Sequence, residues 1–251
     1  MTPVVRLDRI GKRYGRGPWV LRDFTLDVGP GEVVALRGGN GSGKSTALRV
    51  AAGVTAPSSG RVERGPSVGY VPERFPTGVG LSAHDYLRHL AAVRGVPVRR
   101  ELLDDLGFVG DPDAPLATLS KGNAQKVALV QALHATDLLV LDEPWSGLDA
   151  AAGAVLVELV AASGAAVVLT DHHGHDVPGM REVVLGSVRA GGVVIELDRV
   201  GESFPLISGL EGVSEARAVG GGARVEVRSG YSDGVLAEAL RLGCSVRSVR
   251  S

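Results

Sequence analysis

A run of small residues and one lysine follows a short apolar stretch near the start of the chain. It consists of Gly38, Gly39, Asn40, Gly41, Ser42, Gly43, Lys44, Ser45 and Thr46. The first eight fit the pattern G-x-x-x-x-G-K-[ST], whose glycines let backbone N–H groups turn inward around phosphate oxygens. In this pattern the lysine bridges the β- and γ-phosphates and the following hydroxyl binds Mg²⁺. We therefore predict a nucleotide-phosphate site, the alternative being a glycine turn in which Lys44 and Ser45 occur by chance.

Two acidic residues, Asp142 and Glu143, follow a second apolar stretch at residues 138–141. Four consecutive apolar residues indicate a parallel strand covered on both faces, and parallel sheets hold ligands beyond the carboxyl ends of their strands. There Asp142 would reach Mg²⁺ through its water shell, and Glu143 would polarise an attacking water as a general base. The alternative is that both acids simply cap the exposed end of the strand.

Strands and helices alternate around these two segments. Period-2 alternation and apolar runs predict strands at residues 4–10, 20–28, 32–36, 60–63, 68–71, 138–141, 165–169, 183–188 and 193–197. Helical spacing predicts helices at residues 45–52, 82–94, 98–106, 121–134 and 148–162. This alternation favours an α/β fold with a mainly parallel, doubly covered sheet. We expect a P-loop NTPase (RecA-like) core with an N-terminal antiparallel β subdomain and an inserted helical subdomain at about residues 76–136.

After residue 200 the order of the predicted elements changes. A hairpin is predicted at residues 214–219 and 224–227 across Gly220-Gly221-Gly222, followed by a helix at 232–242 and a strand at 245–249. We therefore predict a first domain at residues 1–200 and a small α+β appendage of ββαβ order at residues 201–251.

The composition is that of an ordinary globular protein, with 251 residues, 44% of them hydrophobic and 22% charged. A formal net charge of −1 gives no general attraction for nucleic acid. The single cysteine, Cys244, excludes an internal disulfide and fits a reducing cytoplasm. The N-terminus lacks a signal-peptide pattern, and polar residues and glycines interrupt the most apolar stretch, residues 150–169. We expect a soluble chain whose membrane role would need a partner.

The segment Leu119-Ser120-Lys121-Gly122-Asn123 lies between the two halves of the predicted site. Ser120 is placed to cap the helix predicted at residues 121–134, so its hydroxyl, the nearby N–H groups and the helix dipole form an anion receptor. The alternative is a plain helix cap. The segment resembles the signature motif, LSGGQ, of ATP-binding-cassette (ABC) ATPases. Lys121 and Asn123 depart from its commonest form, although SKGN resembles a variant of export-type cassettes.

Other segments resemble the ABC pattern in its order along the chain. Tyr14 occupies the place of the aromatic residue that stacks on adenine, with an ordinary strand-end tyrosine as the alternative. The run Ser146-Gly147-Leu148-Asp149 resembles the D-loop, which touches the opposite subunit. His172 resembles the switch histidine that contacts the γ-phosphate. His173 is the competing choice, and an exposed loop histidine is the remaining alternative.

Two positions depart from the family pattern. Glu73 stands where ABC ATPases usually have glutamine. A carboxylate still ligates Mg²⁺ as a hard, charged oxygen donor, but a donor N–H is lost, so we expect activity to be retained and coupling to the partner subunit to differ. Trp145 stands where a small polar residue is common, and we expect it to serve packing.

The resemblance covers residues 4–200 and implies a complete nucleotide site. It implies ATP and Mg²⁺ as cofactors, Glu143 and His172 as catalytic residues, and Ser45, Glu73 and Asp142 as metal ligands. The nucleotide-binding residues would be Tyr14, Gly38, Gly39, Asn40, Gly41, Ser42, Gly43, Lys44, Ser45, Thr46, Ser120, Lys121, Gly122 and Asn123.

The resemblance also implies partners. Two cassettes would close head-to-tail, with residues 120–123 on the nucleotide of the opposite protomer; a homodimer is preferred and a heterodimer is the alternative. A separately encoded transmembrane permease would hold the cytoplasmic chain at the inner face of the cell membrane, and no nucleic-acid partner is expected. Residues 76–94, Glu73 and SKGN resemble drug- or lipid-type exporters, so we expect an exporter ATPase. The alternatives are a nucleotide-sensing regulatory subunit and a soluble ABC ATPase acting on ribosomes or DNA.

Overall fold

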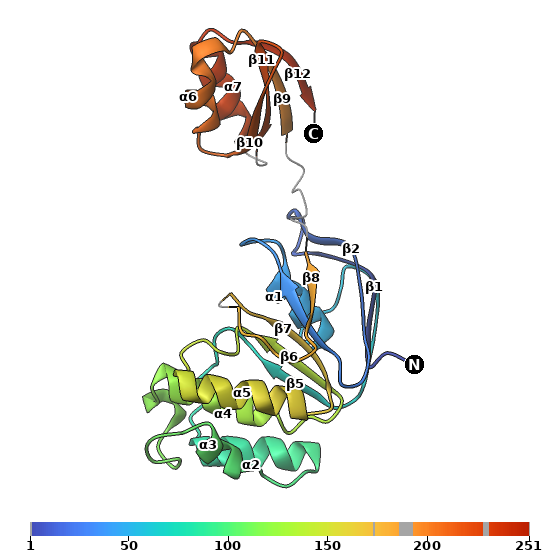
Figure 1. Ribbon diagram of the computed structural model, residues 1–251, viewed down its shortest axis with the longest axis vertical. Coiled ribbons are helices and arrows are strands. Elements are labelled where there is room, and N and C mark those ends of the chain that lie inside the picture. Colours follow the sequence, from blue (N-terminus) through green and yellow to red (C-terminus); the bar gives the residue numbers. More distant parts are fainter. Residues whose placement is uncertain (1, 173, 186–192, 228–230, 251) are drawn as a thin grey trace. The chain divides into compact units, whose positions relative to one another are not determined.

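The structure is a computed structural model, which describes the chain except for Met1, His173, residues 186–192, residues 228–230 and Ser251 (Figure 1). The chain forms two compact units, which are described separately. Unit 1 comprises Met1–Gly15 and Trp19–Ser187, and unit 2 comprises Arg16–Pro18 and Val188–Ser251.

Unit 1 is built on a parallel sheet, as the sequence predicts. Five of the described strands form it in the order β5-β6-β7-β3-β8, and each neighbouring pair is parallel. They are β3 (Val33–Arg37), β5 (Val68–Val71), β6 (Leu138–Asp142), β7 (Ala166–Thr170) and β8 (Arg181–Val184). The three inner strands β6, β7 and β3 read as continuous apolar runs because layers of structure cover both of their faces.

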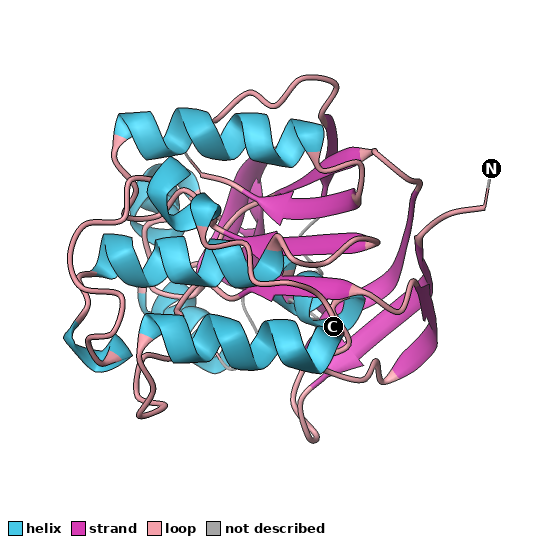
Figure 2. Cartoon of the chain, turned by 90° about the horizontal axis from the view of Figure 1, so that it is seen from below, coloured by secondary structure: helices cyan, strands magenta, loops and turns pink. Residues whose placement is uncertain are grey.

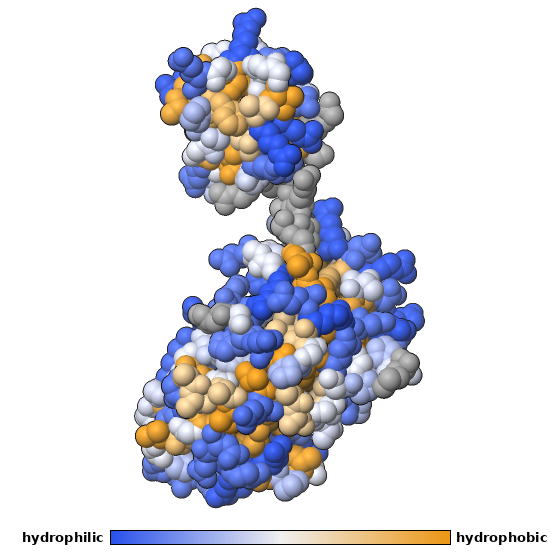
Figure 3. Space-filling model, viewed as in Figure 1, coloured by the Kyte–Doolittle hydropathy of each residue, from blue (hydrophilic) through white to orange (hydrophobic). Residues whose placement is uncertain are grey.

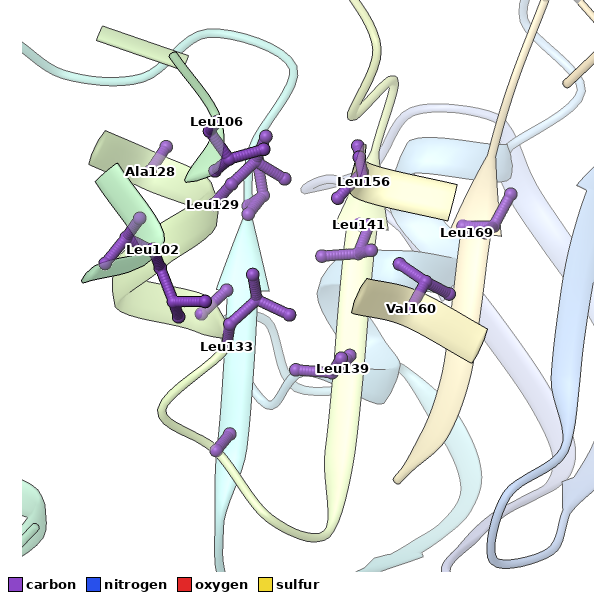
Figure 4. Close-up of a cluster of buried hydrophobic side chains, with 14 of the residues drawn as sticks. Leu102, Leu106, Ala128, Leu129, Leu133, Leu139, Leu141, Leu156, Val160 and Leu169 are labelled. Carbon is purple, nitrogen blue, oxygen red and sulfur yellow. The ribbon is translucent and has the colours of Figure 1, made fainter. Parts of the chain in front are cut away.

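Alternate residues of each inner strand face the two layers. On β6, Leu139 and Leu141 pack under α4 (Lys121–Ala132) and α5 (Ala150–Ala162), and Figure 4 shows them among the leucines of those helices. Figure 2 shows the long helices side by side along one side of the strands. Leu138 and Val140 face the opposite layer, which includes α1 (Lys44–Ala51). Each fully buried leucine contributes about 1.5–3 kcal/mol to stability.

A second, antiparallel sheet completes the layer that contains α1. Three of the described strands form it in the order β2-β1-β4: β1 (Val5–Arg13), β2 (Trp19–Val28) and β4 (Ser59–Arg64). Val5, Leu7 and Ile10 of β1 pack against residues of α1 and of the parallel sheet. The predicted N-terminal antiparallel subdomain is thereby confirmed, and the strand predicted at residues 60–63 is its third member.

The inserted helices are α2 (Ala83–Arg94), α3 (Glu101–Asp105), the 3₁₀ turn η1 (Leu116–Thr118) and α4. Ser82 caps α2 as expected, because its hydroxyl accepts a hydrogen bond from the backbone N–H of Asp85 at 3.0 Å. The helix predicted at residues 98–106 begins only at Glu101, since the N–H of Arg99 is bonded to His134 instead. In the described part of the chain no helix is long and apolar enough to cross a bilayer. Figure 3 shows hydrophilic and hydrophobic residues interspersed on the visible face of each unit.

His134 links the end of α4 to the segment before α3. Its Nδ1 lies 2.6 Å from the carbonyl oxygen of Val130, and its Nε2 accepts from the backbone N–H of Arg99 at 2.9 Å. A ring that donates through one nitrogen and accepts through the other is neutral. Burial lowers the pKa of His134 below its ordinary value of 6.5, and the hydrogen bond to Val130 opposes this only in part.

We expect unit 1 to lose stability as the pH falls through the histidine range. The unfolded chain takes up a proton at His134 near its ordinary pKa of about 6.5, whereas the folded chain does so only at lower pH. The free energy of unfolding therefore declines as the pH falls from the ordinary pKa toward the lowered one. Urea unfolding from about pH 8 to about pH 5, followed by tryptophan fluorescence, measures this decline in unit 1, which holds both Trp19 and Trp145.

His134→Gln is the matched variant for this experiment, because an amide keeps a donor and an acceptor but does not titrate. Its free energy of unfolding should depend less steeply on pH than that of the wild type. Equal slopes in the two proteins would contradict the assigned role of His134.

Unit 2 differs from the expected ββαβ appendage. Its described elements are β9 (Val193–Asp198), η2 (Gly201–Ser203), α6 (Phe204–Ser208), β10 (Val213–Val219), β11 (Gly222–Val227), α7 (Ser232–Arg241) and β12 (Ser245–Arg250). The strands pair antiparallel in the order β10-β11-β9-β12. This is the βαββαβ arrangement of ferredoxin-like folds. The predicted boundary at residue 200 is therefore wrong: β9 belongs to unit 2, because it pairs with β11 and β12 and buries Ile195 and Leu197 in their core.

Candidate functional site

Most of the predicted phosphate-loop residues, together with the predicted acids, line one cavity of unit 1. The cavity has a volume of about 310 Å³. It is lined by Val20, Asn40, Gly41, Ser42, Gly43, Lys44, Ser45, Thr46, Glu73, Asp142, Glu143 and His172. Asp142 and Glu143 lie at the end of β6 and His172 follows β7, so the adjacency of these two strands brings them together. Glu73 follows β5, on the other side of β6.

The loop between β3 and α1 has the backbone that a phosphate cradle requires. Gly38, Gly41 and Gly43 have φ angles of 147°, 77° and 95°, a region that side chains disfavour. A Cβ atom on Gly43 would lie 2.7 Å from the carbonyl oxygen of Val20, so no larger residue fits there. Gly43 directly precedes α1, and the unpaired N–H groups and dipole of the first helical turn favour an anion at that point.

Lys44 lies folded over this loop. Its Nζ donates to the carbonyl oxygens of Gly38 and Gly39 at 2.8 and 3.1 Å. The ammonium group is therefore held beside the loop that presents the N–H groups. Gly38 and Gly39 do not line the cavity themselves, and their part in the site is to hold the amine.

Asp142 and Glu143 are joined through a residue that the sequence does not single out, Thr170 at the end of β7. The hydroxyl of Thr170 donates to Asp142 Oδ1 at 2.8 Å and accepts from the backbone N–H of Glu143 at 3.0 Å. Asp142 and Thr170 are opposite each other in the β6–β7 register. Thr170 thus sets the orientation of one carboxylate and the backbone position of the other.

The remaining oxygens of these acids fit a cation. Within the described residues, buried Asp142 Oδ2 and Glu143 Oε1 accept no hydrogen bond. A buried carboxylate oxygen without a donor is costly, and a bound ion or ligand would remove that cost. Mg²⁺ prefers oxygen ligands and usually combines one or two carboxylates with substrate phosphates. The hydroxyl of Ser45 and the carboxylates of Glu73 and Asp142, which line the same cavity, are a donor set of this kind.

Glu143 and His172 face each other across the strand ends. The backbone N–H of His172 donates to Glu143 Oε2 at 3.2 Å, and its ring Nε2 lies 3.4 Å from Glu143 Oε1. Glu143 has a φ of 51°, which is uncommon for a residue with a side chain and is typical of functional positions. The competing histidine, His173, lies outside the described residues.

Tyr14 does not line this cavity, and Val20 lies there instead. The tyrosine is 48% exposed, and Lys12 Nζ lies 5.0 Å from its ring centroid. The phenol groups of Tyr70 and, to a smaller extent, Tyr14 raise the pKa of Arg49 above its ordinary value. An exposed aromatic ring held at its edge is free to stack on a flat ligand, so adenine stacking stays a prediction for Tyr14.

The signature-like segment borders a different opening of unit 1. Ser120, Gly122 and Asn123 line a hollow of about 700 Å³ together with Val109, Lys126, Gly147, Leu148 and Asp149. Ser120 caps α4 as predicted, since its hydroxyl accepts from the N–H of Asn123 at 3.2 Å. Lys121 does not line the hollow; its Nζ donates to Ser146 Oγ at 2.9 Å. No residue borders both this hollow and the phosphate cavity in the described chain.

The comparisons with known proteins agree with this geometry. The chain matches the family model described as "ABC transporter" over residues 21–146. It is 37% identical over 194 residues to the zinc import ATP-binding protein ZnuC of Rhizobium johnstonii, which is 73% of this chain and 63% of that protein. It is 36% identical over 215 residues to the aliphatic sulfonates import ATP-binding protein SsuB 3 of Nocardia farcinica, 82% of each protein. The match thus spans less than two thirds of the Rhizobium protein.

Solved structures give the same fold. The structure of an ATP-binding subunit of an ABC transporter has a TM-score of 0.65 and 27% identity, over 75% of this chain and 88% of that chain. A dimeric ATP-binding cassette in a post-hydrolysis state, bound to ADP and Pi, has a TM-score of 0.61 and 23% identity, over 73% of this chain and 94% of that one. The second likeness shows the fold alone.

Proposed function

The chain belongs to the ABC transporter family, and from this premise we propose that it is the subunit that binds and hydrolyses ATP to drive a membrane transporter. The observation that carries the proposal is the cavity of about 310 Å³. It combines the phosphate loop with Asp142, Glu143 and His172, so phosphate binding and water activation share one place.

In this proposal each residue of the cavity has one task. The N–H groups of the loop and the amine of Lys44 bind the phosphates. Ser45, Glu73 and Asp142 hold Mg²⁺, which when bound neutralises the negative charge of the phosphates. Glu143 takes a proton from the attacking water, and the ring of His172, beside Glu143, contacts the terminal phosphate. Two of the buried oxygens without a hydrogen-bond donor, Asp142 Oδ2 and Glu143 Oε1, acquire partners in this way.

A second copy of the chain, or a related cassette, completes the site in this proposal. The hollow at Ser120, Gly122 and Asn123 shares no lining residue with the phosphate cavity, and in this proposal the nucleotide that touches both lies between two chains. Moving a closure equilibrium from 1:99 to 99:1 takes about 5.5 kcal/mol of differential affinity. A nucleotide that bridges two surfaces supplies such a difference, because the open chain offers it only half of the ligands.

The cargo and the direction of transport depend on the membrane-spanning partner. Export is predicted because residues 76–94, Glu73 and the SKGN segment resemble those of exporters. The two related proteins named above carry import names, so the comparisons give no support to export. Co-expression with the membrane-spanning partner, followed by assays of zinc and organic-solute transport in vesicles of known orientation, decides the direction. ATP-driven uptake into inside-out vesicles corresponds to export, and loss of solute from them corresponds to import.

Phosphate release by the purified chain tests the proposed activity. We expect turnover that requires Mg²⁺, stops with a chelator and increases when the membrane partner is present. ATP binding with no phosphate release in either state would contradict hydrolysis and would favour the regulatory alternative.

A further inference from the structure

The segments that follow β6 and β7 touch a second time, beyond Glu143 and His172. The indole ring of Trp145 and the imidazole ring of His175 are stacked, with centroids 4.5 Å apart and planes inclined by 9°. Trp145 is two residues beyond Glu143, and His175 is three residues beyond His172. The two catalytic candidates are therefore followed, on both segments, by residues that contact each other.

Trp145 is the fixed side of this stack. It is 4% exposed and belongs to the core cluster under α4 and α5. Its indole N–H donates to the carbonyl oxygen of Gly153 on α5 at 3.2 Å. A buried ring that is bonded to a helix offers a rigid surface to whatever packs on it.

His175 attaches the segment after β7 to that surface. Its Nδ1 lies 3.1 Å from Asp171 Oδ1, and its backbone N–H donates to Asp171 Oδ2 at 2.6 Å. Asp171 is in turn held by Arg37 at the end of β3, whose guanidinium donates to the Asp171 carbonyl and lies 3.9 Å from its carboxylate. Asp171, directly before His172, and His175, three residues after it, are thus bonded to each other.

His172 needs this support because its own side chain is 52% exposed. The place of a half-exposed ring is set chiefly by its backbone. The ring lies 3.4 Å from Glu143 Oε1, and a small shift of the segment after β7 would change that distance. A misplacement of about 1 Å that a mutation far from the reacting atoms causes at the site costs up to about 100-fold in rate.

We propose that Trp145 and His175 are positioning residues for hydrolysis, which hold His172 beside Glu143 through their stacked rings. This rests on the proposed function. The sequence predicts only a packing role for Trp145. The structure shows that it packs on the ring of His175. Neither residue touches the phosphate cavity, so their effect passes through His172.

Steady-state kinetics of three variants test the proposal. Trp145→Ala should lower kcat about 10- to 100-fold and leave KM for ATP within about threefold, because the phosphate loop is untouched. Trp145→Phe keeps a flat ring and should restore most of kcat. His175→Ala should match Trp145→Ala, and the double variant should lose no more than either single one, since both remove the same contact. Multiplied losses in the double variant would overturn the proposal.

A fluorescence measurement tests the stack without hydrolysis. The chain has two tryptophans, so Trp19→Phe leaves Trp145 as the single emitter. Removing the imidazole from the face of the indole changes the surroundings of the emitter, and His175→Ala in this background should therefore change its emission. Unchanged emission would show that the rings are not stacked in solution and would overturn the proposal.

Leu102→Ala is the matched control, because Leu102 is buried in the same core cluster but lies on α3. It should lower the unfolding midpoint and leave kcat unchanged. If it lowers kcat as much as Trp145→Ala does, loss of stability explains both and the positioning role is wrong. If the wild type releases no phosphate, the proposed function fails; if the wild type is active and Trp145→Ala is equally active, this inference alone fails.

Discussion

Glu143→Gln should leave ATP binding intact and stop hydrolysis. An amide has nearly the shape of a carboxylate, so its oxygen can still accept from the backbone N–H of His172. The hydrogen bond to Thr170 comes from the backbone N–H of residue 143 and does not involve the side chain. The amide does not take a proton from water, however, and loss of a general base costs about 10²- to 10⁴-fold in rate. Phosphate release measures the loss, and calorimetric titration with ATP measures the retained affinity.

The same variant should accumulate as an ATP-bound dimer, because the nucleotide that bridges two chains is no longer cleaved. Gel filtration with ATP and with ADP checks this, and a dimer is expected with ATP only. Glu158→Gln, an exposed glutamate on α5, is the control that removes a charge elsewhere and should behave as wild type. A normal rate of hydrolysis in Glu143→Gln would exclude Glu143 as the base.

Lys44→Ala should weaken nucleotide binding itself. The amine lies beside the loop, 2.8 Å from the carbonyl oxygen of Gly38. Without it the β- and γ-phosphates would have one positive charge fewer beside them. Hydrogen bonds to charged groups contribute about 1.5–3 kcal/mol, which corresponds to about a 10- to 100-fold rise in the dissociation constant for ATP. Calorimetric titration measures it directly.

Arg61→Ala, which removes an exposed cation from β4, is the control for this titration and should bind ATP as the wild type does. Adenosine offers a further comparison, because it has no phosphates and its binding should not respond to Lys44. Equal ATP affinity of Lys44→Ala and the wild type would refute the phosphate loop as the binding site.

Contiguous motifs of this chain were predictable, because their chemistry depends on residues close together in sequence. The loop from Gly38 to Thr46 needs its glycines at fixed spacing, and the helix cap at Ser120 depends on a contact three residues away. The α/β fold was also predictable, since apolar runs at β6 and β7 indicate strands that are covered on both faces. The parallel sheet then brings Glu73, Asp142 and His172 to one edge, because they lie at or just beyond the carboxyl ends of parallel strands.

Contacts between distant residues were not predictable. Thr170 orients Asp142 across 28 residues of sequence, and Trp145 stacks on His175 across 30. Neither contact leaves a spacing pattern, because both arise from the adjacency of β6 and β7. The predicted domain of β9 was wrong because this assignment also depends on contacts between distant residues. The alternating apolar residues of β9 fit either sheet, and only its pairing with β11 and β12 assigns it to unit 2.

The position of β9 in the middle of its sheet has a practical consequence for shortened genes. A stop codon just after Val200 would leave this strand in the product and remove both of its neighbours. Ile195 and Leu197 would then be exposed to water, and both edges of the strand would lack hydrogen-bond partners. Such edges invite pairing between molecules, and the truncated product should precipitate. A stop placed before β9 removes the whole sheet and avoids this hazard.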